Sequence, residues 1–310
     1  MQTQEIPKLF LEKITEILPE KEIEDFKKAL VEPPLKSFRV NSLRASPKEV
    51  KESLEAKGFK LTQMNWYTYG FFVNSFGASL GNTLEHFLGK IYVQDASSML
   101  PVIPLEAEED ESILDLAAAP GSKTTQIGMD MKNQGLIIAN EPNQKRIQAL
   151  QDNLERLGII NTVITRNDGR YFRKMPDAFD KVLLDAPCSL EGTMFKDEKI
   201  KHRWGPNFVS GSAKLEYELL KAAITATKSK GTIIYSTCTI SPEENELVVN
   251  KVLKEFDIEL KPVEFKGVNQ SNGLTKYKDF EINKQIKRCV RIWPHKAKIG
   301  AFFLTKIMKK

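Results

Sequence analysis

Residues 112–124 read SILDLAAAPGSKT. The apolar start predicts a buried strand, and the small side chains that follow form a loop that opens a helix at Lys123. Backbone N–H groups in such a loop can approach a ligand closely. Twenty residues after Gly121, the acid Glu141 ends the next predicted strand. A carboxylate at that spacing accepts hydrogen bonds from both hydroxyls of a ribose, so the stretch predicts a nucleoside site.

The loop contains one glycine, which departs from the fingerprint of dinucleotide-binding proteins. It therefore favours a nucleoside without a pyrophosphate, and S-adenosylmethionine fits. A plain strand-to-helix turn with an exposed glutamate is the alternative. Asp168 follows the third predicted strand, where its carboxylate would accept from the amine of an adenine; aspartates at strand ends also form turns.

Strands and helices alternate from residue 111 onward, which predicts a Rossmann-like, doubly wound α/β sheet with parallel strands. The expected strands are 112–116, 136–140, 162–165, 179–185 and 232–236, and Ser241 with Glu244 is expected to form a capping box. Before them, residues 1–30 predict helices and 35–75 a small α+β unit. We therefore expect an N-terminal RNA-binding region over 1–90 and a catalytic domain over 91–310.

Composition narrows the class of protein. Of 310 residues, 41% are apolar and 28% charged, and no apolar run approaches the roughly 18 residues that a membrane span needs. Residues 1–11 lack the features of a secretory signal. The three cysteines, 50 and 51 positions apart, match neither a disulfide framework nor zinc-ligand pairs. These observations predict a cytoplasmic protein without a metal; the oligomeric state is not readable, and a monomer is assumed.

The charge is uneven along the chain. Residues 261–310 contain 13 Lys and Arg against three acids, whereas residues 1–260 contain 33 basic and 38 acidic residues. A basic end indicates a polyanion partner such as nucleic acid, and a solvated lysine-rich face is the alternative. Arg39 and Arg44 are candidate RNA contacts from the small unit.

Two cysteines follow neighbouring strands of the predicted sheet. Cys188 lies just beyond Asp185 at the end of the fourth strand, and Cys238 ends the fifth. Both should face one crevice, unless each is merely a small buried apolar residue. A thiolate that attacks C6 of a cytosine makes C5 nucleophilic enough to accept a methyl group from a sulfonium. Asp185 would hydrogen-bond the N3/N4 edge of that base.

Several stretches resemble the Sun/nucleolar-protein family of RNA 5-methylcytosine methyltransferases. They are residues 114–124, 139–141 with Arg146, 180–189, 235–238 with 244–246, 291–295, 301–303, 38–41 and 93–98. The resemblance implies a methyltransferase sheet, S-adenosylmethionine as the methyl donor and RNA as the acceptor. It also implies that Cys238 is the nucleophile and that Cys188 assists product release.

The same resemblance implies the remaining site residues by position. The cofactor or the target base would contact Ala117, Ala118, Ala119, Pro120, Gly121, Ser122, Lys123, Glu141, Arg146, Asp168 and Asp185. Transfer RNA is the preferred substrate and ribosomal RNA the alternative. Two other classes stay open: a non-catalytic RNA-binding or ribosome-assembly factor, and a DNA methyltransferase, although the DNA enzymes do not supply the second cysteine.

Overall fold

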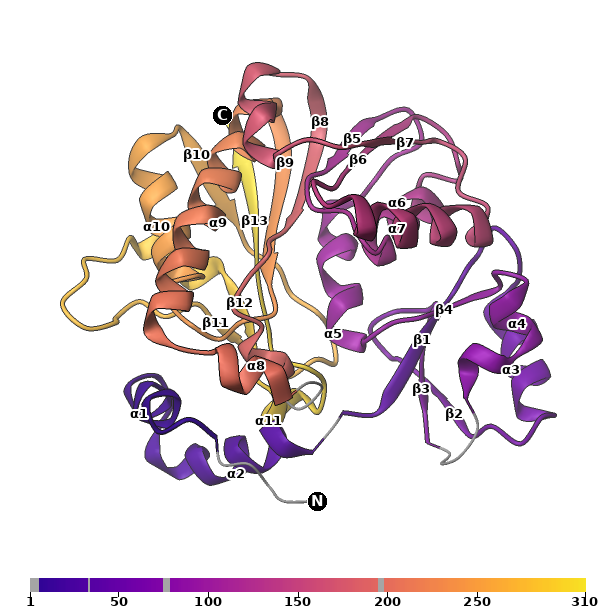
Figure 1. Cartoon of the computed structure of the whole chain (residues 1–310), viewed down its shortest axis with the longest axis horizontal. Coiled ribbons are helices and arrows are strands. Elements are labelled where there is room, and N and C mark those ends of the chain that lie inside the picture. Colours follow the sequence, from indigo (N-terminus) through magenta and orange to yellow (C-terminus); the bar gives the residue numbers. More distant parts are fainter. Residues whose placement is uncertain (1–5, 33, 75–78, 195–197) are drawn as a thin grey trace.

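The computed structural model of the chain describes residues 6–32, 34–74, 79–194 and 198–310. Within them the strands form two sheets (Figure 1). The larger has the order β11-β12-β13-β9-β8-β5-β6-β7, with β10 paired to β13, and the smaller has the order β2-β3-β1-β4. The larger sheet lies between helices, as the alternation of strands and helices predicts.

Five neighbouring strands of the larger sheet run parallel. They are β5 (Ser112–Asp115), β6 (Leu136–Asn140), β7 (Thr162–Thr165), β8 (Phe179–Asp185) and β9 (Thr227–Thr237). The helices that alternate with them are α6 (Ser122–Asp130), α7 (Gln144–Leu157), α9 (Pro206–Ala226) and α10 (Glu246–Glu255). Local signals set the ends of α7: the Asn143 side chain accepts from the N–H of Lys145, and Gly158 ends the helix with φ 72°. This part of the sequence prediction is confirmed.

The C-terminal strands make the sheet mixed rather than wholly parallel. β13 (Phe302–Lys309) pairs antiparallel with β9, and β12 (Val290–Ile292), β11 (Gln270–Asn272) and β10 (Ile258–Lys261) are antiparallel to their neighbours. Short connections can join antiparallel strands, whereas a parallel neighbour needs a long crossover. The register places Phe303 opposite Thr237, which brings the start of β13 beside the end of β9.

The smaller sheet forms an α+β unit with its own apolar core. Its elements are β1 (Lys36–Val40), α3 (Pro47–Glu55), β2 (Leu61–Gln63), β3 (Gly70–Val73), α4 (Leu84–Phe87) and β4 (Ile91–Val93). Phe38 stacks on Phe71 with ring centroids 5.3 Å apart. Since β4 pairs with β1, this sheet continues past residue 90, the division that the sequence suggested.

Arg39 joins this unit to the larger sheet. Its side chain is fully buried, and its guanidinium donates to Gln94 Oε1 (3.2 Å), Thr125 Oγ1 (2.8 Å) and the Ser122 carbonyl (3.3 Å). Arg44 donates to the carbonyl of Leu157. The prediction that Arg39 contacts RNA is therefore wrong, because a guanidinium inside the protein satisfies its donors there.

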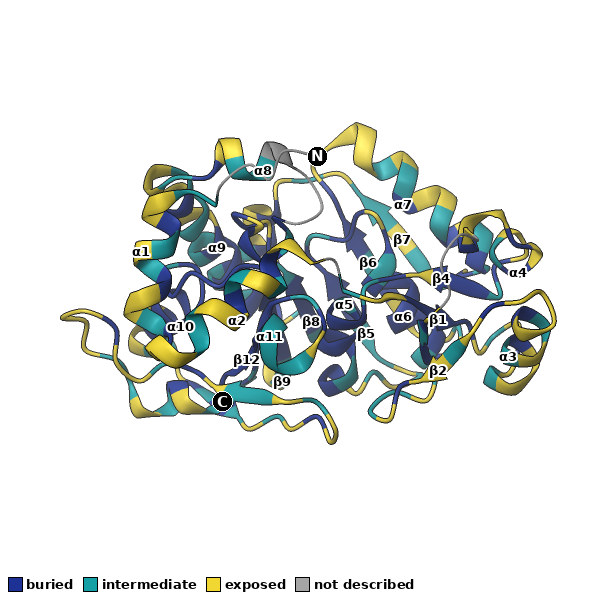
Figure 2. Cartoon of the chain, turned by 90° about the horizontal axis from the view of Figure 1, so that it is seen from below, coloured by how far each residue is buried: buried dark blue, intermediate teal, exposed yellow. Residues whose placement is uncertain are grey.

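The N-terminal helices pack far from the small sheet. α1 (Lys8–Ile17) and α2 (Glu20–Val31) lie beneath α8 (Glu198–Arg203) and α11 (Pro294–Ala297) (Figure 1). Phe10, Ile14 and Phe26 enter a core that also contains Trp204 and Trp293. Figure 2 shows burial concentrated on the central strands, while the outer turns of α3 and α7 are exposed. In the described residues, no helix is long and apolar enough to cross a membrane.

The predicted capping box at Ser241 does not form. α10 begins only at Glu246, and the Ser241 hydroxyl donates to Glu191 Oε1 at 2.6 Å. Glu244 instead accepts from the backbone N–H and the hydroxyl of Ser189. Tertiary partners outcompete the local cap because both carboxylates are buried and need donors.

The basic end of the chain is largely neutralised by acidic residues from elsewhere. Eight of its 13 basic side chains form ion pairs among the described residues: Lys261, Lys278, Arg288, Arg291, Lys296, Lys306, Lys309 and Lys310. Arg291 is buried with Glu246, with 2.5 Å between Nη2 and Oε2. Because the fold places acids beside most of these cations, the basic end by itself supports a polyanion partner less strongly than its composition indicates.

Candidate active site

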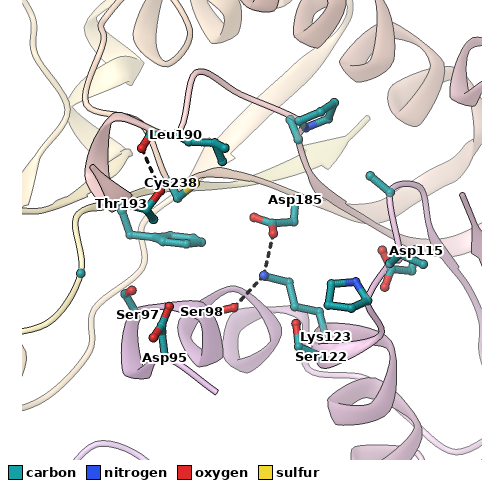
Figure 3. A pocket seen from close by; sticks show the side chains of 18 of the residues that line it. Asp95, Ser97, Ser98, Asp115, Ser122, Lys123, Asp185, Leu190, Thr193 and Cys238 are labelled. Carbon is teal, nitrogen blue, oxygen red and sulfur yellow. Dashed lines mark hydrogen bonds and ion pairs between the residues drawn. The ribbon is translucent and has the colours of Figure 1, made fainter. Parts of the chain in front are cut away.

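A cavity of about 390 Å³ lies at the carboxyl ends of β5, β8 and β9 (Figure 3). Its wall combines residues from six parts of the chain: Asp95, Ser97, Ser98, Asp115, Ala117, Ala118, Ala119, Pro120, Ser122, Lys123, Arg146, Asp185, Ala186, Pro187, Leu190, Thr193, Cys238, Gly300, Ala301 and Phe302. Strand ends are where ligands bind in doubly wound sheets. The volume lies within the range of small-molecule sites.

The loop after β5 supplies one side of the cavity. Gly121, the N-cap of α6, has φ 100°, a conformation that L side chains rarely adopt. A Cβ atom there would also lie 3.0 Å from Leu150 Cδ1. Of the seven loop residues expected to contact the cofactor, Gly121 alone is absent from the cavity wall. It shapes the turn that exposes its neighbours.

Glu141 stands behind the cavity wall and contacts it through Arg146. The carboxylate is 1% exposed; Oε1 accepts from the N–H of Asn143 at 2.9 Å, and Oε2 lies 3.0 Å from Arg146 Nη1 without accepting a hydrogen bond. Arg146 lines the cavity and donates to the Ala119 carbonyl. Arg146 is thus the member of this ion pair that borders the cavity, and a contact of Glu141 with a ribose stays a prediction.

Asp168 does not lie on the cavity wall. Arg170 holds its carboxylate through contacts from Nε (2.9 and 3.1 Å) and Nη2 (2.5 Å), and these hydrogen bonds lower the pKa of Asp168 to about 2. Asp168 also caps a short helical turn by accepting from the N–H of Arg170. The turn-forming alternative therefore describes its local contacts, and a contact with adenine stays a prediction.

Asp185 projects into the cavity between two partners. Its Oδ2 lies 2.6 Å from Lys123 Nζ, and its Oδ1 accepts from Ser236 Oγ at 2.8 Å. Lys123 Nζ donates in turn to Ser98 Oγ at 2.8 Å (Figure 3). The carboxylate is thus fixed in orientation by strand β9 and by helix α6, with its side chain 29% exposed to the cavity.

The two strand-end cysteines meet, as their placement in the sequence predicts. Cys188 Sγ and Cys238 Sγ lie 3.4 Å apart. Cys238 lines the cavity, whereas Cys188 is buried behind it. The hydrogen bond with Cys238, together with burial, raises the pKa of Cys188 well above its ordinary value. Cys238 is therefore the thiol that a ligand in the cavity can touch, and Cys289 is a core residue, 1% exposed.

Several wall residues were not assigned a role from the sequence. Asp95, Ser97 and Ser98 arrive on and just before the short helix α5 (Ala96–Met99), and Phe302 arrives on β13. Asp115 ends β5, so the strand-end argument that identified Asp185 applies to it as well. Its carboxylate accepts from Thr124 Oγ1 at 2.6 Å, and burial raises its pKa to about 6.

Comparison with known proteins decides the family. Residues 102–308 match the family model "16S rRNA methyltransferase RsmB/F". The chain belongs to this family. Residues 6–96 match a second model, the N-terminal domain of 16S rRNA methyltransferase RsmF. The resemblance inferred from the sequence motifs and the predicted methyltransferase fold are confirmed.

Relatives of the chain differ in the RNA that their names give. The chain is 41% identical to ribosomal RNA small subunit methyltransferase F of Vibrio campbellii over 92% of its own length, but spans 61% of that relative. It is 38% identical to the tRNA (cytosine(49)-C(5))-methyltransferase of Pyrococcus abyssi, with 92% of both chains covered. A solved methyltransferase homolog from Pyrococcus horikoshii matches with a TM-score of 0.88 and 33% identity, covering 98% of this chain and 95% of that one.

Proposed function

We propose that this chain transfers a methyl group from S-adenosylmethionine to C5 of a cytosine in RNA. The observation that carries the proposal is the pair of sulfurs 3.4 Å apart, one of them on the wall of a cavity that also holds Asp185 and Lys123. Membership of the RsmB/F family supports the same chemistry. A cysteine beside a carboxylate and a lysine is suited to covalent activation of a pyrimidine ring.

The cavity residues suit the proposed methyl donor. Arg146, in an ion pair with Glu141, borders the cavity, and the small side chains of the β5–α6 loop leave room for a nucleoside. Asp115, with a pKa of about 6, would be held charged by a sulfonium or ammonium group in the cavity. When bound, the donor supplies an electrophilic methyl group.

The protein residues perform the remaining steps. The Cys238 thiolate forms a bond to C6 of the cytosine, and the electron pair moves to C5, which then takes the methyl group. Asp185, oriented by Lys123 and Ser236, hydrogen-bonds the N3/N4 edge and stabilises the charge on the ring. Loss of the C5 proton to a base returns the electron pair and expels the Cys238 thiolate. Cys188, in contact with Cys238, would assist this release.

Transfer RNA is the substrate that we propose. The relative matched over 92% of both lengths carries a tRNA position in its name, and this supports the choice. The names of the RsmF relatives support small-subunit ribosomal RNA as the second candidate. In either case the target cytosine must leave its base stack to reach Cys238.

The test is a denaturing gel of wild type, Cys188→Ala and Cys238→Ala after incubation with S-adenosylmethionine and unmodified transcripts of tRNA or small-subunit rRNA. We expect only Cys188→Ala to retain a denaturant-resistant RNA adduct, and only with its proper RNA. Trapping by Cys238→Ala alone would reverse the two roles. Donor binding without methylated nucleoside in either RNA would favour a non-catalytic RNA-binding factor, and methylation of duplex DNA alone a DNA enzyme.

A further inference from the structure

A second contact runs beside the pair of sulfurs. Each cysteine is followed by a hydroxyl residue, Ser189 after Cys188 and Thr239 after Cys238. The two hydroxyl oxygens lie 3.0 Å apart, so the loops after β8 and β9 touch at two consecutive positions. Only the first of these contacts borders the cavity. The second lies behind it, inside the protein.

The carboxyl group of Glu244 contacts both Ser189 and Thr239. Its Oε1 accepts from the N–H of Ser189 at 2.7 Å, and its Oε2 accepts from Ser189 Oγ at 2.6 Å and lies 3.0 Å from Thr239 Oγ1. Glu244 is fully buried. Burial raises the pKa of Glu244 to about 7. Buried hydrogen bonds of this kind restrict geometry strongly, because each lost partner leaves a polar group without compensation.

Two other acids, Glu191 and Glu216, lie near the contact between Ser189 and Thr239, but neither bonds Ser189 as Glu244 does. Glu191 is occupied by Ser241 Oγ (2.6 Å) and Trp204 Nε1 (2.7 Å), and reaches the contact only through Thr239 (2.8 Å). Burial and the nearness of Glu244 raise the pKa of Glu216 well above its ordinary range, and the Glu216 carboxyl forms no hydrogen bond with Ser189 or Thr239. Glu244 alone bonds both the backbone and the hydroxyl of the residue after Cys188.

We propose that Glu244 is a positioning residue for the cysteine pair: through Ser189 and Thr239 it holds Cys188 Sγ and Cys238 Sγ in contact. Of the described residues on the cavity wall, none is Glu244, Ser189 or Thr239, so the effect passes through the cysteines. The significance of the pair for methyl transfer rests on the proposed function. The distance between the sulfurs can be tested without it.

The ease with which Cys188 and Cys238 form a disulfide depends on the distance between their sulfurs. Exchange with the cyclic disulfide of dithiothreitol converts the two thiols into one protein disulfide and releases dithiothreitol, so oxidant and reductant balance. The equilibrium constant measures how readily sulfurs 3.4 Å apart close to the roughly 2 Å of a bond. Cys289, 1% exposed, stays outside the reaction. We expect Glu244→Gln and Thr239→Val each to lower this constant about tenfold, the effect of one buried hydrogen bond.

Matched controls separate positioning from general destabilisation. Glu243→Gln alters the neighbouring carboxylate, which binds Lys13 and Tyr277 instead, and Thr239→Ser keeps the hydroxyl; both should leave the constant within about twofold of wild type. Wild-type constants for both Glu244→Gln and Thr239→Val would overturn the proposal. If Glu244→Gln does not fold, the comparison of Thr239→Val with Thr239→Ser decides it.

A further readout joins the two proposals. If the chain methylates RNA, Glu244→Gln should lower kcat and leave unchanged the Kd for S-adenosylmethionine, since Glu244 does not reach the cavity. Loss of donor binding in this variant would contradict a role through the cysteines. Because thiol exchange needs neither RNA nor donor, a failure of the methylation assay does not alter its result.

Discussion

At the scale of single residues, Lys123 is the cation around which the site is arranged. It is 6% exposed, yet it bonds Ser98 on α5 and Asp185 on β8 and lies 5.8 Å from the ring centre of Phe302 on β13. Three elements that are distant in sequence therefore converge on one ammonium group. A carboxylate that loses such a partner is no longer held in one orientation.

We expect Lys123→Met to lower the rate of methyl transfer by about a hundredfold, because Asp185 would no longer be fixed against the target base. Single-turnover kinetics with saturating donor and RNA measure this. Lys132→Met is the control, since Lys132 is 69% exposed in its ion pair with Glu109. Equal rates in the two variants would remove Lys123 from the reaction.

Asp115 should make stability depend on pH. Its pKa rises from 3.8 to about 6 on folding, chiefly through burial, so between these values the folded state binds more protons than the unfolded state. Stability contributed by this group therefore falls as pH rises through the window. We expect the free energy of unfolding of Asp115→Asn, relative to wild type, to rise by roughly 2 kcal/mol between pH 4 and 7.

Urea unfolding across that pH range measures the difference. Asp110→Asn, which changes an exposed carboxylate just before the same strand, is the matched control and should show no such rise. A constant difference for Asp115→Asn would mean that Asp115 is not desolvated in the folded protein.

At the scale of elements, helix α1 completes the polar network behind the cysteines. Lys13 Nζ donates to Ser241 Oγ at 2.7 Å and lies 3.8 Å from the buried Glu191. We expect Lys13→Met to lower the free energy of unfolding by about 1 to 3 kcal/mol, because Glu191 would lose its nearest cation. Lys8→Met on the same helix, at a side chain 91% exposed, should change it by less than about 0.5 kcal/mol in the same urea titration.

Most elements could be predicted because their signals are local. Asn143 caps the start of α7, and Gly158 ends the helix in a left-handed conformation. The apolar runs of β5 and β8 reflect burial on both faces of the sheet. The same strand ends brought Cys188 and Cys238 together. The prediction of a cap at Ser241 was wrong because a short local pattern carries no information on Glu191, 50 residues away, whose carboxylate accepts the hydrogen bond of the Ser241 hydroxyl.

Site residues outside the parallel strands could not be placed for a related reason. Asp95 and Phe302 enter the cavity from either end of the catalytic part of the chain, and nothing in their own neighbourhood indicates which strands they meet. The antiparallel register of β13 on β9 decides the position of Phe302. Only the assembled sheet contains that information.

At the scale of the whole molecule, the charge that could bind RNA is sparser than the composition indicates. Lys296 is paired with Glu22 at 2.7 Å, whereas Lys298 is exposed beside a second cavity of about 410 Å³. Gly300 borders both this cavity and the one that holds Cys238. If RNA binds as proposed, we expect Lys298 to contact a phosphate near the target cytosine.

We expect Lys298→Ala to make the log–log dependence of RNA affinity on salt shallower by about 0.7 to 0.9, the contribution of one phosphate contact. Lys306→Ala, which removes a cation already paired with Glu106, should leave the slope unchanged. Filter binding at several salt concentrations gives the slopes. An unchanged slope for Lys298→Ala would exclude this lysine from the RNA interface.

The buried guanidinium of Arg39 has a consequence for how this protein can be recombined. Because it donates to the Ser122 carbonyl and to Thr125 in the first turn of α6, the small sheet helps to build the loop that borders the active site. In a chimera that exchanges residues 36–93 for those of another protein, the Ser122 carbonyl and Thr125 would lose this donor unless an arginine is kept at position 39. The small sheet therefore cannot be exchanged independently of helix α6, and substitutions at Arg39 are expected to require matching substitutions at the start of that helix.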